Sequence, residues 1–98
     1  MSTVKFVSTA NLAGTFDLCV IGGSCTGVFA ALRAARLGLK VALVELSNRF
    51  GGVATLGQVG MWHTLFDTAG EQQIIAGLTF ETSERLEKRA ACTPFREA

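Results

Sequence analysis

The chain has 98 residues, which is enough for one small domain. Apolar residues make up 49% of it and charged residues only 17%, where about 25% charged is ordinary. The net charge of +1 gives no basis for binding nucleic acid or an anionic membrane surface. A chain this short buries a modest fraction of its surface, so the apolar surplus predicts that something else covers part of it.

The first 16 residues are interpreted as either a short added strand or a loose leader. They combine Val4, Phe6 and Val7 with a stretch of small and polar residues. No basic region is followed by a long apolar core, so the segment is not typical of a secretory signal. Within residues 17–45, the longest charge-free run, residues 18–32, is interrupted by glycines and is too short to span a bilayer. We therefore predict no transmembrane segment.

Residues 17–45 contain the pattern around which the chain is organised. A continuous apolar run over residues 18–21 predicts a strand buried on both faces of a parallel sheet. A glycine-rich turn over residues 22–27 and an alanine-rich amphipathic stretch follow it. A second apolar run, residues 41–44, predicts the next strand and leads into Glu45. Together they form one βαβ unit, whose order and spacing favour a dinucleotide-binding site.

The helix of this unit is predicted to end at Gly38. Its charged residues are expected to point away from one apolar face. The positions expected on that face are Val28, Ala31, Leu32 and Ala35.

The turn residues suit a pyrophosphate. Gly22 can take the positive φ that a tight strand-to-helix turn requires. The missing side chains of Gly22 and Gly23 let backbone N–H groups approach a pyrophosphate, which the positive end of the helix also attracts. Gly27 allows the helix to pack closely on the strand. The usual pattern is G-x-G-x-x-G, and Ser24 replaces its middle glycine; either Gly23 takes part of that role, or the serine hydroxyl contacts a phosphate.

Glu45 lies near the roughly 20-residue offset at which an acid meets an adenosine ribose. A carboxylate there accepts hydrogen bonds from ribose hydroxyls and repels a 2′-phosphate, which favours FAD or NAD over NADP. Gly51 and Gly52 follow the second strand and are expected at the same rim, since ligands bind outside the carboxyl ends of the strands. The alternatives are a βαβ unit whose glycines serve only its own turn, and a plain flexible turn at residues 51–52.

Residues 53–68 are apolar but too rich in glycine for a regular element, as in loops that wrap a ligand or pack beneath another domain. Within them, Trp62 is interpreted as core. His63, the only histidine, is interpreted as structural or exposed, with a catalytic or flavin-facing role as the alternative.

The cysteines, Cys19, Cys25 and Cys92, have no C-x-x-C spacing, and their odd number argues against a disulfide framework. Reduced thiols and a cytoplasmic location are therefore expected. Cys25 is interpreted as a small residue that fills the turn, in preference to a catalytic thiol.

Residues 71–92 predict a second helix, with Glu71 near its start, Gly77 inside it and Thr93-Pro94 after it. Its charged side chains are interpreted as a solvated face. The residues that follow helical spacing are Ile74, Ile75, Leu78, Thr82, Leu86 and Ala90. Residues 95–98 are expected to form no element.

Taken together, residues 17–23, Gly27, residues 41–45 and residues 51–55 resemble the start of FAD-dependent oxidoreductases with a glutathione-reductase-like FAD-binding domain. The resemblance extends over about residues 17–86. It implies an α/β fold: a partial Rossmann-like βαβ unit that binds FAD or NAD, a glycine-rich loop region and a second helix.

The resemblance also implies the site residues. It assigns Gly22, Gly23, Ser24 and Gly27 to the FAD pyrophosphate and Glu45 to the adenosine ribose. It assigns Gly51, Gly52 and Thr55 to a loop that approaches the pyrophosphate and the flavin. Cys25 and Thr26 replace a more usual Pro-Ala or Ser-Gly pair and are counted among the cofactor-binding residues. No metal ligand is predicted, and no residue is a secure acid, base or nucleophile.

Residues 17–98 are therefore interpreted as the incomplete N-terminal part of an FAD-binding domain, preceded by the leader or strand of residues 1–16. Family members are several hundred residues long, so the expected function is to hold the ADP part of FAD within a larger oxidoreductase. The isolated chain is not expected to turn over alone. The expected partners are FAD and the rest of the oxidoreductase, or a partner subunit, over the apolar surface. The alternatives are a non-catalytic or truncated subunit that docks on a partner chain, and an NAD-binding module.

Overall fold

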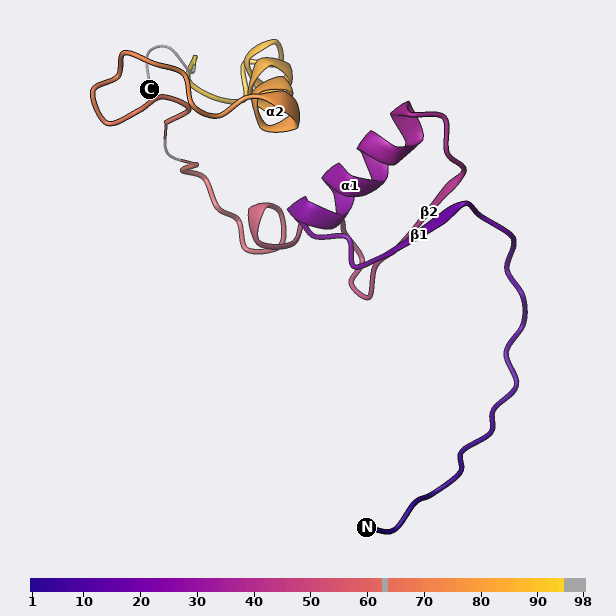
Figure 1. Cartoon of the computed structure of the whole chain (residues 1–98). Coiled ribbons are helices and arrows are strands. Elements are labelled where there is room, and N and C mark those ends of the chain that lie inside the picture. Colours follow the sequence, from indigo (N-terminus) through magenta and orange to yellow (C-terminus); the bar gives the residue numbers. More distant parts are fainter. Residues whose placement is uncertain (63, 95–98) are drawn as a thin grey trace.

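The structure is a computed structural model that describes residues 1–62 and 64–94. His63 and residues 95–98, with the expectations attached to them, lie outside the described residues. Figure 1 shows the elements in chain order. They are β1 (Leu18–Ile21), α1 (Cys25–Arg36), β2 (Val41–Val44), the 3-10 helix η1 (Gly52–Ala54) and α2 (Gly77–Glu87).

The two strands pair in parallel, as a βαβ unit requires. Leu18 lies opposite Val41, and Ile21 lies opposite Val44. At the start of the pair, the Asp17 carboxylate accepts a hydrogen bond of 2.7 Å from the Lys40 N–H. The α/β fold class and the partial Rossmann-like unit predicted from the sequence are confirmed.

Helix α1 packs against this sheet through its smallest residues. Gly27, Ala31 and Ala34 are buried, whereas the predicted face included Leu32 and Ala35, which are exposed. The buried face is therefore rotated from the predicted one, because close approach of a helix to two strands favours the smallest side chains. The helix ends as expected, with Leu37 as its C-cap and Gly38 at φ 92°.

The prediction that β1 is buried on both faces is wrong for this chain. Ile21 is 81% exposed and Leu18 37% exposed. Helix α1 covers one face of the pair, and no described segment covers the other (Figure 1). The Cα radius of gyration is 18.6 Å, against roughly 13 Å for a compact chain of 100 residues. Much of the apolar surplus therefore lies on the surface.

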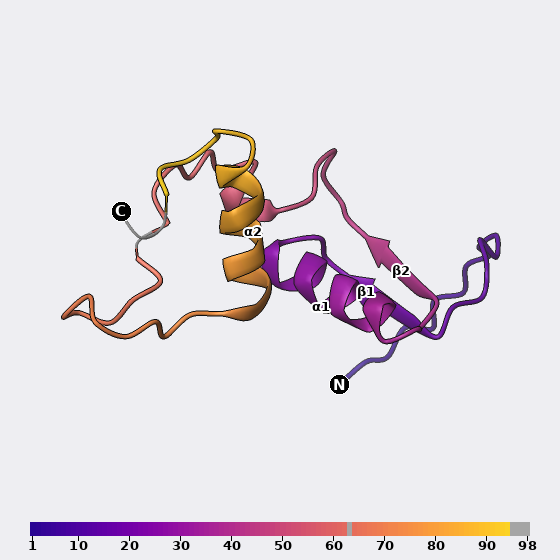
Figure 2. The same ribbon diagram turned by 90° about the horizontal axis from the view of Figure 1, so that it is seen from above.

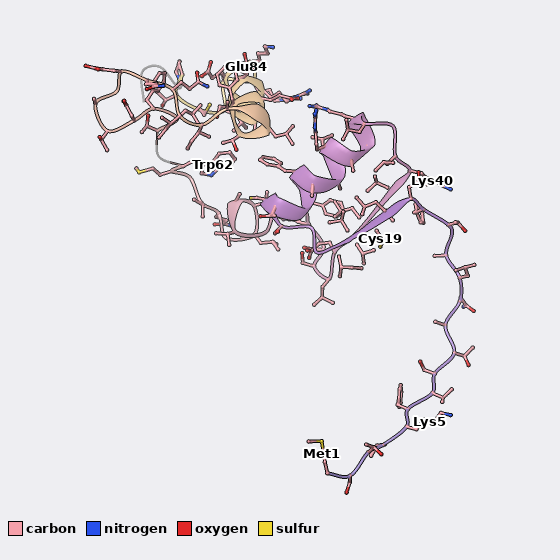
Figure 3. All side chains as sticks on the ribbon, in the orientation of Figure 1. Met1, Lys5, Cys19, Lys40, Trp62 and Glu84 are labelled. Carbon is pink, nitrogen blue, oxygen red and sulfur yellow. The ribbon has the colours of Figure 1, made fainter. Side chains whose placement is uncertain are left out.

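Residues 1–16 contain no helix or strand and extend away from the βαβ unit (Figure 1). The labelled residues Met1 and Lys5 lie far from every element in Figure 3. Val4 is 93% and Phe6 86% exposed. Among the described residues, no helix is long and apolar enough to cross a membrane.

The second helix begins six residues later than predicted, at Gly77 instead of Glu71. Glu71 instead belongs to a turn in which its N–H donates to the Asp67 carboxylate at 2.9 Å. An antiparallel bridge between Phe66 and Gln73 closes this turn. Gly77 has a φ of 66°, so it starts the helix from a left-handed conformation and is not an interior residue.

Helix α2 also ends earlier than predicted, at Glu87. The N–H of Ala90 donates to the Glu87 carbonyl at 2.8 Å, and that of Ala91 donates to the Leu86 carbonyl at 2.9 Å. Ala90, at φ 51°, takes the left-handed position that this type of C-terminal motif requires. The helix therefore stops before Thr93-Pro94, through hydrogen bonds that helical periodicity did not reveal.

Candidate functional site

The two glycine pairs meet at the carboxyl ends of β1 and β2. The N–H of Gly51 donates to the carbonyl of Gly23 at 2.7 Å, and Ser24 and Gly51 form a parallel bridge. Gly51 and Gly52 both have positive φ, 103° and 52°. Residues separated by a strand, a helix and a loop are thus brought to one rim, where the sequence placed them.

Side chains are excluded from this rim for steric reasons. A Cβ atom on Gly27 would overlap the carbonyl oxygen of Gly22, so α1 could not start so close to β1. A Cβ atom on Gly23 would overlap the ring of Phe50. Gly22, at φ 105°, differs: a Cβ atom there would meet nothing within 4 Å. The turn is therefore closely packed on its inner side and open at Gly22.

The sequence predicted that backbone N–H groups at Gly22 and Gly23 approach a pyrophosphate. In this structure the N–H groups of these two residues are hydrogen-bonded within the protein and do not point out to a ligand. Gly22 donates to the Val44 carbonyl at 2.8 Å. Gly23 donates to Oε1 of Glu45 at 2.9 Å. The glycine turn thus binds the strand end and the acid, and these bonds set its shape.

The start of α1 carries the N–H groups of this rim that are still available to a ligand. Ser24 is the N-cap, and its Oγ accepts a hydrogen bond from the Gly27 N–H at 3.4 Å, which leaves the hydroxyl hydrogen able to donate. The N–H groups of Ser24 and Thr26 have no hydrogen-bond partner in the described part of the chain. Cys25 turns its thiol to the Gly51 carbonyl at 3.1 Å. Unpaired N–H groups at a helix N-terminus attract an anion.

Glu45 is half-buried at the end of β2 and uses both carboxylate oxygens. Oε1 accepts the Gly23 N–H, and Oε2 accepts both the hydroxyl and the N–H of Ser47, each at 2.6 Å. The hydrogen bond from the Ser47 hydroxyl, then those from the N–H groups of Ser47 and Gly23, lower the pKa of Glu45 below its usual value. The acid is therefore ionised at neutral pH and fixed against the glycine turn.

Thr55 shapes the second glycine turn from within. Its Oγ1 donates to the carbonyl of Phe50 at 2.5 Å, directly before the two glycines. A hollow of about 380 Å³ lies between the end of β2 and the segment of residues 45–50 that leads into this turn. It is lined by Leu43, Val44, Glu45, Ser47, Asn48, Arg49 and Phe50.

The sequence suggested that Trp62 belongs to the core, and the structure shows that it does not. It is 45% exposed, and its Nε1 donates to the carbonyl of Val59 at 2.9 Å. The loop that carries it passes beneath α2 (Figure 3). A hollow of about 790 Å³ lies between loop and helix. Its lining residues are Val59, Gly60, Met61, Trp62, Thr64, Leu65, Thr79, Ser83, Leu86, Ala91, Cys92 and Thr93.

Sequence reasoning missed two residues at the rim, Ser47 and Phe50. Phe50 fills the space beside Gly23, and Ser47 makes two hydrogen bonds to Glu45. A signal for Ser47 was present, because a serine two positions after an acid can donate to that acid through both its N–H and its hydroxyl. The three cysteines are free and exposed.

A parallel βαβ unit, with two glycine turns and an ionised acid at one rim, defines a dinucleotide-binding class of protein. The family model described as FAD dependent oxidoreductase matches residues 17–98. The chain belongs to this family, whose cofactor is FAD.

Two curated relatives agree with the family. The chain is 33% identical over 87 residues to the mitochondrial dihydrolipoyl dehydrogenase of Schizosaccharomyces pombe, in an alignment that covers 78% of this chain and 17% of that protein. It is 51% identical over 43 residues to the glutathione reductase of the same organism, covering 44% of this chain and 9% of that protein. The chain thus spans less than a fifth of the length of either relative. No solved structure matches the chain.

Proposed function

We propose that this chain is the N-terminal FAD-binding portion of an FAD-dependent oxidoreductase and that it holds the ADP part of FAD. One observation carries the proposal: residues 22–27, Glu45 and residues 51–55 converge on the carboxyl ends of two parallel strands. In open α/β sheets this edge is where ligands bind. On this proposal, residues 17–98 are an incomplete domain and residues 1–16 are a leader outside it.

The pyrophosphate is assigned to the start of α1. The N–H groups of Ser24 and Thr26 and the hydroxyl of Ser24 are the donors there, in line with the positive end of the helix dipole. The space over Gly22, in which a Cβ atom would meet nothing, gives the diphosphate room to approach. The second turn lies beside the start of α1: the Cys25 thiol donates to the Gly51 carbonyl, and the Thr55 hydroxyl donates to the Phe50 carbonyl directly before the two glycines.

The ribose is assigned to Glu45. Its carboxylate accepts hydrogen bonds only, so it suits the hydroxyls of an unmodified ribose. A ribose with a 2′-phosphate would bring two negative charges together in the hollow beside Glu45. Arg49 also lines that hollow, but it is Glu45 that accepts a hydrogen bond from the glycine turn, from the N–H of Gly23. We therefore assign FAD, and not a 2′-phosphorylated dinucleotide, to this rim.

The bound flavin would supply the redox chemistry. The residues named here bind and orient the nucleotide end, and none of them is assigned as a catalytic acid, base or nucleophile. Substrate and electron acceptor depend on the remainder of the enzyme.

The test is a titration of the purified chain, and of the complete protein that contains it, with FAD, followed by flavin absorbance and fluorescence. ADP should compete with FAD, and ADP that carries a 2′-phosphate should compete much less. NAD should bind more weakly than FAD. If the complete protein never shows flavin absorbance, or if NAD binds more tightly, the FAD assignment is wrong.

A second role follows from the exposed apolar surface. Ile21, Val44 and Leu46 are 81%, 50% and 104% exposed at the same end of the sheet. Such a surface favours coverage by the remainder of the oxidoreductase or by a partner subunit. Light scattering checks this: the isolated chain should self-associate as its concentration rises, and a stable monomer at high concentration would count against it. The cytoplasmic location also stays a proposal, supported by the free thiols.

A further inference from the structure

Ser47 lies between the two glycine turns, and neither the glycine pattern nor the family resemblance assigns it a role. Its N–H donates to Oε2 of Glu45 at 2.6 Å. Its Oγ lies 2.6 Å from the same Oε2 and 2.9 Å from the carbonyl oxygen of Arg49. A serine hydroxyl has one hydrogen, so it can donate to only one of these two acceptors at a time.

Together with the backbone of residues 47–51, these hydrogen bonds form a closed ring at the rim. Glu45 is bonded through Oε1 to the N–H of Gly23, and the carbonyl of Gly23 accepts the N–H of Gly51. The chain from Gly51 leads back through Arg49 to Ser47. The side chain of Ser47 therefore joins the Glu45 carboxylate to the segment of residues 47–51 that leads into the second glycine turn.

The number of donors on each carboxylate oxygen sets how a ribose could bind. A carboxylate has about four lone-pair sites over its two oxygens. Among the described residues, the hydrogen bonds to Oε2 come from two donors, both on Ser47, whereas the one to Oε1 comes from the N–H of Gly23. One ribose hydroxyl can reach the remaining site on Oε1 directly. A second hydroxyl reaches Oε2 only if the Ser47 hydroxyl gives up its place there.

We propose that Ser47 is a positioning residue, which holds the Glu45 carboxylate against the glycine turn and transfers its own hydrogen bond to the Arg49 carbonyl when a ribose diol binds. The inference rests on the proposed function of Glu45 as the ribose acceptor. The Arg49 carbonyl is already within hydrogen-bond distance, so the exchange leaves the Ser47 hydroxyl paired and tightens residues 47–51 around the nucleotide.

The experiment uses three variants of the full chain. Ser47→Ala removes the hydroxyl, and Ser47→Thr keeps it. Ser83→Ala is the matched control, because the Ser83 hydroxyl also donates to a backbone carbonyl, that of Thr79, but lies on α2 away from the rim. The Glu45 side-chain carboxyl carbon is titrated by NMR without any nucleotide, and the FAD dissociation constant is measured separately. Arg49, the charged residue that shares the hollow with Glu45, is unchanged in every variant.

We expect Ser47→Ala to raise the pKa of Glu45 towards its usual value and to weaken FAD binding by roughly three- to tenfold. Ser47→Thr should resemble the wild type in both measurements, and so should Ser83→Ala. Adding FAD to the wild type should slow amide hydrogen exchange at Gly51, and Ser47→Ala should reduce that effect.

Unchanged titration of Glu45 in Ser47→Ala overturns the inference, and so does a Ser47→Thr variant that behaves like Ser47→Ala. Unchanged FAD affinity in Ser47→Ala, beside a shifted titration, overturns the positioning role in binding. If the wild type does not bind FAD while the Glu45 titration still depends on the Ser47 hydroxyl, the proposed function fails and the hold of Ser47 on Glu45 stands.

Discussion

Residues 17–55 and residues 56–94 differ in what determines their structure. In the first region, parallel strand pairing and the contacts between two glycine turns fix the chain at many points. In the second, one antiparallel bridge, one helix and a single buried hydrophobic residue, Leu65, are found among the described residues. Backbone hydrogen bonds and steric exclusion act over short distances, so they specify a βαβ unit even when little apolar surface is buried around it.

An ion pair joins the two regions. Arg36, in the last turn of α1, donates two hydrogen bonds to the Glu81 carboxylate of α2, at 2.7 and 2.8 Å. Arg85 donates to the same carboxylate at 2.9 Å. Glu81 was expected on a solvated face, and the structure instead makes it the link between the helices, which lie near one another in both views (Figures 1 and 2). Exposed ion pairs of this kind stabilise weakly, so the second region is the less firmly held.

The largest expected effect breaks the first region alone. Gly27→Val places side-chain atoms where the Gly22 carbonyl lies, so α1 must move away from β1. We expect a loss of about 3 kcal/mol or more of unfolding free energy, at the upper end of overpacking effects. Denaturant unfolding followed by far-UV circular dichroism measures it. Gly60→Ala is the matched control, because a Cβ atom there meets nothing within 4 Å, and it should unfold like the wild type.

The next effect separates binding from folding within the first region. Glu45→Gln keeps the shape of the side chain and removes its charge. Hydrogen bonds to a charged acceptor contribute about 1.5–3 kcal/mol, so FAD affinity should fall roughly tenfold to a hundredfold. Isothermal titration of the complete protein measures this, and thermal unfolding of the apo form measures separately what the charge contributes to the glycine turn through the hydrogen bonds from Gly23 and Ser47. Wild-type affinity in this variant would show that Glu45 serves only the glycine turn.

A smaller effect tests where the second helix begins. If Gly77 were a helix-interior residue, Gly77→Ala would stabilise the chain by about 1 kcal/mol. In the structure Gly77 has a φ of 66°, so alanine there is strained, and we expect a loss of about 1–2 kcal/mol. Hydrogen exchange of the amides of α2 reports the sign directly. Slower exchange in the variant would contradict the helix start at Gly77.

The smallest effect concerns the link between the regions. Glu81 accepts hydrogen bonds from Arg36 and from Arg85, and these bonds, with that from Arg36 contributing most, lower the pKa of Glu81 from 4.5 to about 2. A lowered folded-state pKa means that the contribution of this ion pair is fully present above about pH 4.5 and is lost as the pH falls towards 2. Glu81→Gln should therefore remove this dependence and slightly loosen α2. NMR contacts between α1 and α2, measured from pH 6 to pH 2, check both. Persistence of those contacts in Glu81→Gln would show that apolar packing, and not the ion pair, joins the helices.

The sequence by itself determined the βαβ unit and its rim. The two apolar runs became β1 and β2 with the predicted bounds, Gly22 took the predicted positive φ, and the two glycine pairs met where the strand ends place them. These features follow from local rules of backbone conformation and strand pairing, which a sequence pattern states directly. The FAD family follows from the same pattern.

Tertiary structure alone decided the rest. The buried face of α1 is set by how closely it approaches the strands, which selects Gly27, Ala31 and Ala34 over the larger Leu32. The bounds of α2 are set by the Asp67 turn and by the left-handed Ala90, which compete with a helical periodicity that continues through both. Ser47 reaches Glu45 only because the chain bends back directly after β2. In each case the deciding interaction joins groups whose approach depends on how the chain folds, so spacing along the sequence did not reveal it.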